Sequence, residues 1–470
     1  MVDSGNFDLV VLGGGPGGYT AAFRAADLGL SVCLVEQQER LGGVCLNVGC
    51  IPSKTLLHAA TVIEEASEIE EYGVRFEKPE VDVEKLIGKK NTVIEQLTGG
   101  LDGLCTARKI TRKKGKGAFK DAKTITVTGE GTKEDLSFGS AIVATGSYPF
   151  VLPGIPEDSR IWDSTDALAL KNIPQRFLII GGGIIGLEMA QIYSALGSEV
   201  TIVEMLEQII PPADKDLVQP LFLKLKKKYT IMTKTKVTEI TPGDSGITVC
   251  FEGKTAPETA EYDAVLVAVG RRPNTTDMGF EKVGLALDDR GFLIANEKQQ
   301  TSVANIYGIG DVVGEPMLAH KATHEGKVAA EVIAGHDAAF TPMTIPSVAY
   351  TNPEVAWMGL TEKEAKALKI DFEKGKFPWG ASGRALSAGA SGGVTKALFD
   401  KKSRRIIGAG ICGINAGELI HEAVLALEMG ATAEDISLTV HAHPTLAETF
   451  AFAAEIVDGS ITDVMPPKKK

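Results

Sequence analysis

The chain has 470 residues, of which 44% are hydrophobic, and a formal net charge of −12. A chain of this length holds about three domains. Its acidic surface repels phosphate backbones, and no run reaches the roughly 18 to 20 apolar residues of a membrane span, so we expect no nucleic-acid partner and no membrane anchor. The N-terminus lacks the basic start and apolar stretch of a signal peptide, which predicts a cytoplasmic protein.

The first predicted unit is a strand, a Gly-rich turn, a helix and a second strand that ends in an acid. An apolar strand at residues 7–12 precedes the turn Gly-Gly-Gly-Pro-Gly-Gly at 13–18, and the second strand ends at Glu36. In a dinucleotide fingerprint Gly13 makes the turn, Gly15 lets a pyrophosphate approach the backbone, and Gly18 lets helix and strand pack closely. The helix N-terminus then binds the pyrophosphate, and Glu36 accepts ribose hydroxyls.

A cysteine pair follows, in the segment Gly-Gly-Val-Cys-Leu-Asn-Val-Gly-Cys-Ile-Pro-Ser-Lys at 42–54. The Gly residues allow a sharp bend, and Pro52 suits the first turn of a helix. A cysteine at a helix start has its thiolate stabilised by the helix dipole, which lowers its pKa and makes it reactive. Because structural disulfides are rare in the cytoplasm, the pair Cys45 and Cys50 is predicted to be catalytic.

A second copy of the first unit lies 168 residues further on. Its strand covers residues 176–180, its turn reads Gly-Gly-Gly-Ile-Ile-Gly at 181–186, and its acid is Glu204. Glu36 and Glu204 each lie 23 residues beyond the first Gly of their motif. A tight turn without a ligand explains one copy, but two copies with matching acids predict two dinucleotides, most commonly a flavin and a nicotinamide.

The two copies differ in length. The first takes 133 residues from Gly13 to Gly146, and the second takes 89 from Gly181 to Gly270, so the first contains an insertion, which holds the cysteine pair. The four other cysteines are expected to be small core residues. They are Cys33, Cys105, Cys250 and Cys412. The absence of a C-x-x-C pair makes a zinc site unexpected, and we predict no metal.

Near the C-terminus the segment His-Ala-His-Pro-Thr-Leu-Ala-Glu at 441–448 allows two interpretations. Thr445 and Glu448 have the spacing of a helix capping box, which would make His443 an ordinary loop residue. Alternatively, His443 is a catalytic base, since histidine titrates near neutral pH. Spacing alone leaves both alternatives open.

The segment at 42–54 resembles the active-site motif of the flavin-dependent disulfide oxidoreductases, the class I pyridine nucleotide-disulfide family. The resemblance covers essentially the whole chain, including Gly-Asp at 310–311, Met-Leu-Ala-His at 317–320 and the segment 441–448. Within this family, the amino-acid sequence around the two cysteines is similar to that of the members that oxidise dihydrolipoamide with NAD. These serve as E3 components of 2-oxo acid dehydrogenase complexes or of the glycine cleavage system.

The resemblance implies roles for individual residues. Cys45 is the interchange thiol that meets the substrate, and Cys50 lies against the flavin. Lys54 and Glu188 form an ion pair beside the flavin ring, although Lys54 alone could be a surface lysine.

At the C-terminus, the resemblance makes His443 the base and Glu448 the acid that orients it, with His441 as a bystander. Asp311 binds the ribityl chain. The residues expected to contact FAD are Gly13, Gly15, Gly18, Glu36, Lys54, Gly117, Thr145, Gly146, Ser147, Asp311, Met317, Leu318, Ala319 and His320. The residues expected to contact NAD are Gly181, Gly183, Gly186, Glu188, Glu204, Val237 and Gly270.

The expected fold is α/β, with two Rossmann-like dinucleotide-binding domains, a central domain and a C-terminal α+β interface domain. The boundaries are 1–150 for the FAD domain, 151–274 for the NAD domain, 275–345 for the central domain and 346–470 for the interface domain. The resemblance also implies a homodimer, in which the His–Glu pair acts on the cysteines of the other subunit, and dihydrolipoyl groups on lipoylated carrier proteins as partners. The first strand starts so early that we expect no N-terminal lipoyl domain.

Three alternatives share some of these features. Glutathione reductase would favour NADPH and carry cations after the second ribose strand, where the run Glu-Met-Leu-Glu at 204–207 has none. Mercuric reductase would carry a further cysteine pair near the C-terminus, and this tail has no cysteine. A non-catalytic docking subunit would not need both the cysteine pair and His443.

Overall fold

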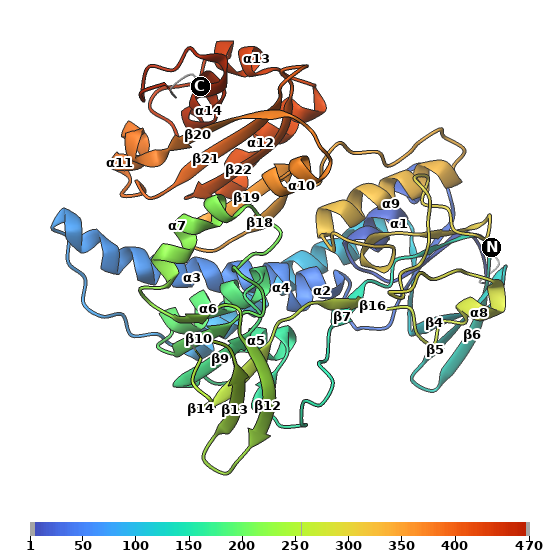
Figure 1. The fold of residues 1–470 in the computed structure, drawn as a ribbon. Helices are drawn as coiled ribbons and strands as arrows, with labels where there is room; N and C mark the ends of the chain where they lie inside the picture. The colour runs from blue at the N-terminus through green and yellow to red at the C-terminus, as the bar shows by residue number, and fades with distance from the viewer. Residues whose placement is uncertain (1–4, 255, 467–470) are drawn as a thin grey trace.

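A computed structural model describes residues 5–254 and 256–466. Figure 1 shows three groups of strands, each with its own helices. The N-terminal group, with helices α1 and α9 beside each other, lies on the right, the middle of the chain forms the lower group, and the C-terminal sheet lies at the top. The expected α/β class with two Rossmann-like units and a C-terminal α+β unit is confirmed.

The N-terminal sheet has the strand order β3-β2-β1-β6-β5-β4, and β17 adds to β6. Strands β1, β2, β3, β6 and β17 pair in parallel, whereas β4 and β5 are antiparallel additions. Because β17 comes from late in the chain, the segment after the second unit returns to the first sheet. The strands are β1 (Asn6–Leu12), β2 (Val32–Glu36), β3 (Thr111–Lys114), β4 (Lys116–Asp121), β5 (Thr124–Gly129), β6 (Thr132–Val143) and β17 (Ile306–Gly308).

Two helices cover one face of this sheet. Helix α1 (Pro16–Asp27) buries Ala21, Ala22 and Ala25, and such small side chains allow α9 (Ala319–Ile333) to approach closely. A Cβ on Gly326 of α9 would lie 2.6 Å from the carbonyl oxygen of Gly17, so glycine is required at this crossing. The short elements η2 (Gly310–Val312) and α8 (Phe280–Val283) precede α9 in the chain.

The insertion predicted in the first copy is a set of helices between β2 and β3. Helix α2 (Gly43–Val48) and helix α3 (Cys50–Glu68) hold the two cysteines, and α3 packs on α4 (Val83–Ala107) and on the second unit. A 3-10 turn, η1 (Ile69–Tyr72), follows α3. Asp82 caps α4 by accepting a hydrogen bond from the Lys85 amide at 3.0 Å. The sequence predicts the helix at Cys50 but not the short helix that carries Cys45.

The second sheet is parallel throughout, with the order β11-β10-β9-β15-β8, and an antiparallel meander, β12-β13-β14, adjoins it. Strands β7 (Ser147–Pro149) and β16 (Arg271–Pro273) pair with each other and connect the two units. The strands are β8 (Ile161–Trp162), β9 (Arg176–Ile180), β10 (Glu199–Val203), β11 (Thr230–Met232), β12 (Lys236–Pro242), β13 (Ile247–Glu252), β14 (Thr259–Tyr262) and β15 (Ala264–Val267). The helices are α5 (Ser164–Ala169), α6 (Ile184–Ala195) and α7 (Lys215–Leu225).

The C-terminal sheet is antiparallel, with the order β18-β19-β22-β21-β20. Its strands are β18 (Ser347–Ala349), β19 (Glu354–Gly359), β20 (Phe372–Pro378), β21 (Val394–Asp400) and β22 (Ile406–Gly413). Its helical elements are α10 (Glu362–Ala367), η3 (Trp379–Ala381), α11 (Gly383–Ser387), α12 (Ala416–Glu428), α13 (Ala433–Leu438) and α14 (Glu448–Asp458). Helix α12 buries Ile420, Ala423 and Leu427, a spacing of three and four residues that places one apolar face on the sheet.

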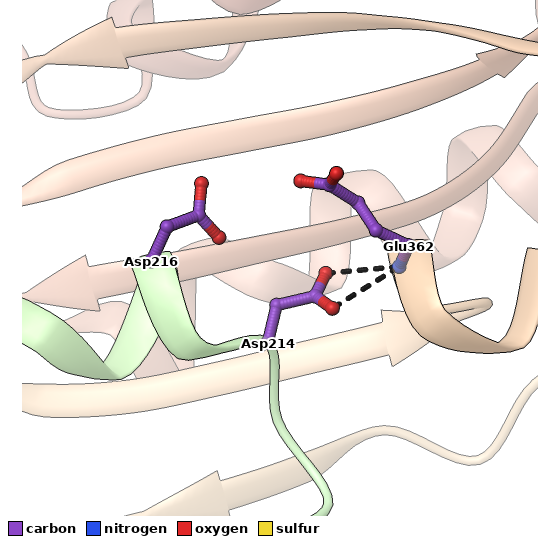
Figure 2. Close-up of side chains that lie close together, drawn as sticks. All are labelled: Asp214, Asp216 and Glu362. Carbon is purple, nitrogen blue, oxygen red and sulfur yellow. Dashed lines mark hydrogen bonds between the residues drawn. The ribbon is translucent and has the colours of Figure 1, made fainter. Parts of the chain in front are cut away.

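An ion network joins the second unit to the C-terminal sheet. Figure 2 shows Asp214 and Asp216 at the start of α7, facing Glu362 at the start of α10. The buried Lys396 of β21, 3% exposed, places Nζ 2.7 Å from Asp214, 2.7 Å from Asp216 and 3.1 Å from Glu362. Although burial opposes the charge, the hydrogen bonds that Lys396 donates to Asp214 and Asp216 raise its pKa.

The carboxylate oxygens of these three acids lie within 4.8 Å of one another, close enough to hold a metal ion. Lysines already supply the positive charge, since Lys374 and Lys376 contact Glu362 and Asp216 at 2.7 and 3.1 Å beside Lys396. Asp214 also accepts the Glu362 backbone N–H at 3.0 Å and so caps a helix of the neighbouring unit. The network is therefore a connection between two parts of the fold.

We predict that Lys396→Met lowers the melting temperature, by an amount equivalent to about 3–5 kcal/mol, because it removes the buried cation of the network and leaves the partly buried Asp214 without its lysine partner. Lys376→Met is the matched control, since that lysine is exposed and should cost less than about 1 kcal/mol. Thermal unfolding of the two variants beside the parent protein measures the difference. Equal melting temperatures for the two variants would contradict the structural role of Lys396.

Candidate active site

A single cavity of about 1880 Å³ runs between the two Rossmann-like units. It exceeds the roughly 300–1,000 Å³ typical of a pocket for one small ligand. Both Gly-rich turns, both acidic strand ends and the cysteine segment line it. The cavity therefore has the size and the lining that two dinucleotides require.

The two Gly-rich turns are built alike. Gly13 and Gly181 adopt φ values of +103° and +114°, and a Cβ on either would lie within 2.4 Å of a backbone carbonyl oxygen. The third glycine of each motif, Gly18 or Gly186, does not line the cavity. A Cβ there would lie 1.8 or 2.1 Å from the first glycine's carbonyl oxygen, so the third glycine allows helix and turn to pack.

Each acid closes its own turn. Glu36 accepts the Gly14 N–H at 2.7 Å and the Gln38 N–H at 2.8 Å. Glu204 accepts the Gly182 N–H at 2.8 Å and, with its other oxygen, the Leu206 N–H at 2.7 Å. Each carboxylate oxygen keeps a free lone pair for a ribose hydroxyl. The two sequence copies therefore form the same pattern of hydrogen bonds between the acid and its turn.

The cysteine segment folds against the first turn. The Gly42 N–H donates to the Gly14 carbonyl at 2.8 Å, and a Cβ on Gly43 would lie 2.7 Å from the Gly15 Cα. Cys45 lies within α2, and Cys50 is the first residue of α3. This contact places both thiols in the lining of the cavity, beside the helix N-terminus that is expected to bind a pyrophosphate.

The two thiols are electrostatically unequal. A hydrogen bond from Cys45, helped by the nearby Lys54 charge, lowers the pKa of Cys50 to about 7, although burial opposes this. The same hydrogen bond and burial raise the pKa of Cys45. Above about pH 7 the proton therefore stays on Cys45 while Cys50 carries the negative charge. The other four cysteines differ from this pair: Cys33, Cys105 and Cys412 are buried, and Cys250 is partly buried.

Lys54 and Glu188 form the expected ion pair. Lys54 Nζ lies 2.9 Å from both carboxylate oxygens of the buried Glu188. Ser53 donates its hydroxyl to the same carboxylate at 2.6 Å, and the Tyr350 N–H donates at 3.3 Å. The Lys54 ammonium also lies 4.5 Å from the centre of the Tyr350 ring. Ser53 and Tyr350 were not predicted, and nothing local in the sequence links them to Glu188.

Asp311 and Ser147 meet in the lining of the same cavity. The Ser147 hydroxyl donates to Asp311 at 2.5 Å and accepts from Arg271 Nε at 2.7 Å, while Arg271 also donates to the Ser147 carbonyl at 2.8 Å. Burial lowers the pKa of Arg271. Sequence reasoning missed Arg271, although its place directly after Gly270 was a signal. Lys236, a further missed cation, also lines the cavity.

His443 and Glu448 are paired but lie outside the cavity lining. His443 Nδ1 lies 2.9 Å from Glu448 Oε1, and the His443 side chain is 78% exposed. The capping box considered for this segment is not formed, because the Thr445 hydroxyl donates to the Ala442 carbonyl and α14 begins at Glu448. Glu448 still accepts the Thr445 N–H at 2.7 Å. One carboxylate therefore holds both the histidine and the backbone of its loop.

The remaining predicted cofactor contacts gather in the cavity. The predicted residues that line it are Gly13, Gly15, Glu36, Lys54, Gly117, Thr145, Gly146, Ser147, Asp311, Met317, Leu318, Ala319, His320, Gly181, Gly183, Glu188, Glu204, Val237 and Gly270, together with Cys45 and Cys50. A buried ion pair, Lys321–Glu325, binds the backbone of Gly310, the residue before Asp311. Glu325 accepts the Gly310 N–H at 2.7 Å and pairs with Lys321 at 2.8 Å.

Fold and cavity together define an enzyme that binds two dinucleotides beside a polarised pair of cysteines. The chain belongs to the pyridine nucleotide-disulphide oxidoreductase family, whose model matches residues 7–326, and the dimerisation domain of that family matches residues 345–454. A dihydrolipoyl dehydrogenase of Vibrio parahaemolyticus is 55% identical over 98% of this chain and 97% of its own length. The dihydrolipoyl dehydrogenase of Bacillus subtilis is 44% identical over 96% and 97%.

Among solved structures, the HOCl-induced flavoprotein disulfide reductase RclA from Escherichia coli is similar, with a TM-score of 0.85 and 26% identity. The match covers 96% of this chain and 100% of that one. No helix in residues 5–254 and 256–466 combines the length and the apolar character needed to cross a membrane.

We predict that alkylation of Cys50 in the reduced protein by iodoacetamide rises with pH through a midpoint near 7, because the thiolate is the nucleophile. Cys45→Ala removes the donor and should raise this midpoint by about one pH unit or more. Cys45→Ser keeps an O–H donor and is the matched control, with a midpoint close to that of the parent protein. If the two variants titrate alike, the Cys45 thiol does not stabilise the Cys50 thiolate.

Proposed function

We propose that this protein is an FAD-dependent dihydrolipoamide dehydrogenase that uses NAD. The observation that carries the proposal is the polarised Cys45–Cys50 pair in one cavity with two dinucleotide-binding turns. Relatives that share 44–55% identity over nearly full length are dihydrolipoyl dehydrogenases, which supports the substrate. FAD occupies the first turn and NAD the second.

The cysteines react as a disulfide in the oxidised enzyme. The deprotonated thiol of dihydrolipoamide attacks Cys45 Sγ, the Cys45–Cys50 bond breaks, and Cys50 leaves as a thiolate. The low pKa of Cys50 makes it the better leaving group. The second substrate thiol, as a thiolate, then attacks the substrate sulfur of this mixed disulfide. The lipoamide S–S bond forms, and Cys45 leaves as a thiolate, which takes a proton. Two electrons thereby pass from the substrate to the cysteine pair.

A bound flavin supplies two-electron transfer between a thiolate and a nicotinamide. The chain's residues prepare that transfer. Lys54, fixed on Glu188, keeps a positive charge beside Cys50 and stabilises its thiolate. Gly13 and Gly15 let the pyrophosphate approach the start of α1, and Ser147 and Asp311 present oxygens for ribityl hydroxyls.

The base is His443, with Glu448 holding the proton on Nδ1 so that Nε2 is free to accept one. Since His443 does not line the cavity of its own chain, it acts on the cysteines of a second copy. The match of residues 345–454 to the family's dimerisation domain supports a homodimer. The partners proposed for this dimer are dihydrolipoyl groups on lipoylated carriers of 2-oxo acid dehydrogenase or glycine cleavage complexes, in the cytoplasm. The domain division 1–150, 151–274, 275–345 and 346–470 belongs to the same proposal.

We predict that kcat/KM for NAD exceeds that for NADP by at least about tenfold, because the Glu204 carboxylate repels a 2′-phosphate. Glu204→Gln should reduce this ratio. It should also weaken the binding of NAD, since the single oxygen of the glutamine amide cannot accept both backbone N–H groups as the two carboxylate oxygens do. Glu207→Gln is the control, because Glu207 is exposed and pairs with Lys215. Steady-state kinetics with both nucleotides measures the ratio, and equal values in the parent protein would contradict the assignment.

We predict that His443→Gln slows reduction of the enzyme by dihydrolipoamide by about 10² to 10⁴, the usual contribution of general base catalysis. Reduction by NADH should change little, since that step needs no substrate deprotonation. Ser437→Ala removes an exposed hydroxyl bond to the Glu434 carbonyl within α13 and leaves the His443–Glu448 pair and its loop intact, so it serves as the control. Stopped-flow absorbance follows both half-reactions. If His443→Gln does not change the rate of reduction by dihydrolipoamide, His443 is not the base, and Glu448 has only its structural role at the start of α14.

A further inference from the structure

His441, expected to be a bystander, is the most firmly held residue of the loop that carries His443. The loop joins α13 to α14 and is largely exposed, with Val440 at 96% exposure. Two side chains of the loop are covered: the apolar Leu446, which is 8% exposed, and the polar His441, which is 9% exposed. A polar side chain buried in an exposed loop anchors that loop only if its polar atoms are satisfied.

Both ring nitrogens of His441 face hydrogen-bond acceptors. Nδ1 lies 2.8 Å from the Thr439 carbonyl oxygen, and Nε2 lies 2.6 Å from Glu422 Oε1 on α12. A neutral imidazole carries one N–H and satisfies one of these acceptors. Both bonds form together only when the ring is the doubly protonated imidazolium, and the bond to Glu422 is then charge-assisted.

The groups around His441 favour that charge. The hydrogen bond to Glu422 raises the pKa of His441, against the effect of burial, and Glu448 of α14 adds to the increase. Glu455 of α14 also faces the ring, and its own pKa is raised by burial. The neighbouring acids of α12 and α14 therefore surround a single cation.

We propose that His441 is a positioning residue for the reaction, an imidazolium clamp that fastens the His443 loop to α12. This inference rests on the proposed function, in which His443 is the base. One residue, Ala442, separates the clamp from the base, and the Thr445 hydroxyl donates to its carbonyl at 2.7 Å. The loop is thus fixed at His441, at Ala442 and, through Glu448, at His443 itself.

The clamp depends on pH in a defined direction. A histidine with a raised pKa in the folded state keeps its full stabilising effect below the ordinary value of about 6.5 and loses it as the pH rises through the folded value. Loss of the proton removes one of the two hydrogen bonds. The loop is therefore held at low pH and loosens at high pH.

Glu422 offers a test that leaves His441 and His443 in place. Glu422→Leu removes the acceptor and should slow reduction by dihydrolipoamide roughly 10- to 100-fold, the usual effect of a base misplaced by about 1 Å. Glu422→Gln keeps a bond to neutral His441, because its amide can donate to Nε2, and should remain within about threefold of the parent protein. In Glu422→Gln, the rate of reduction by dihydrolipoamide should no longer change with pH through the titration of His441. Reduction by NADH should be unchanged in both variants.

The double variant Glu422→Leu/His443→Gln separates positioning from general loss of structure. Positioning through His443 predicts that Glu422→Leu has no further effect once His443 is gone. The proposal is overturned if the fold reductions in rate caused by Glu422→Leu and His443→Gln multiply in the double variant. Equal rates for Glu422→Leu and the parent protein would also overturn it. If the parent protein itself is not reduced by dihydrolipoamide, the proposed function fails, whereas a fast parent protein with silent Glu422 variants refutes only the clamp.

Discussion

One buried carboxylate, Glu188, holds the active site together. It receives the Ser53 hydroxyl, the Lys54 ammonium and the Tyr350 N–H, which come from the cysteine helix α3 and from the C-terminal part of the chain. Burying an ion pair is costly unless its remaining lone pairs are satisfied. Each hydrogen bond to Glu188 uses one of its lone pairs and holds another part of the chain in place. The position of the Lys54 cation beside Cys50 therefore depends on contacts among α3, α6 and the segment that carries Tyr350.

The local chemistry of the site is visible in the sequence because it is local in the chain. Each Gly-rich turn and its acid lie within 23 residues, and the carboxylate closes its own turn through bonds to Gly14 and Gly182. The reactivity of Cys50 is local as well, because the hydrogen bond that lowers the pKa of its thiol comes from Cys45, five residues earlier. Such features need only one strand–turn–helix unit to form.

What the sequence did not reveal comes from contacts between distant segments. Arg271 reaches Ser147 across 124 residues, and Tyr350 reaches Glu188 across 162, so no spacing rule connects them. The family resemblance, rather than any local pattern, led us to expect His443 away from the cysteines of its own chain, and His443 does not line that cavity. His441 was passed over because a histidine near a base resembles any loop residue until its two acceptors are known.

The lysine-centred network between α7 and β21 has a consequence for the conditions under which the two parts stay docked. Dissolved ions screen exposed charges over about 8–10 Å but have little access to Lys396, which is almost wholly covered. The hydration of charged groups also becomes less favourable on heating, which reduces the cost of having buried them. The Lys396 contacts between the second Rossmann-like unit and the C-terminal sheet therefore depend less on ionic strength than the exposed Lys376 contact does, and their desolvation cost falls as the temperature rises.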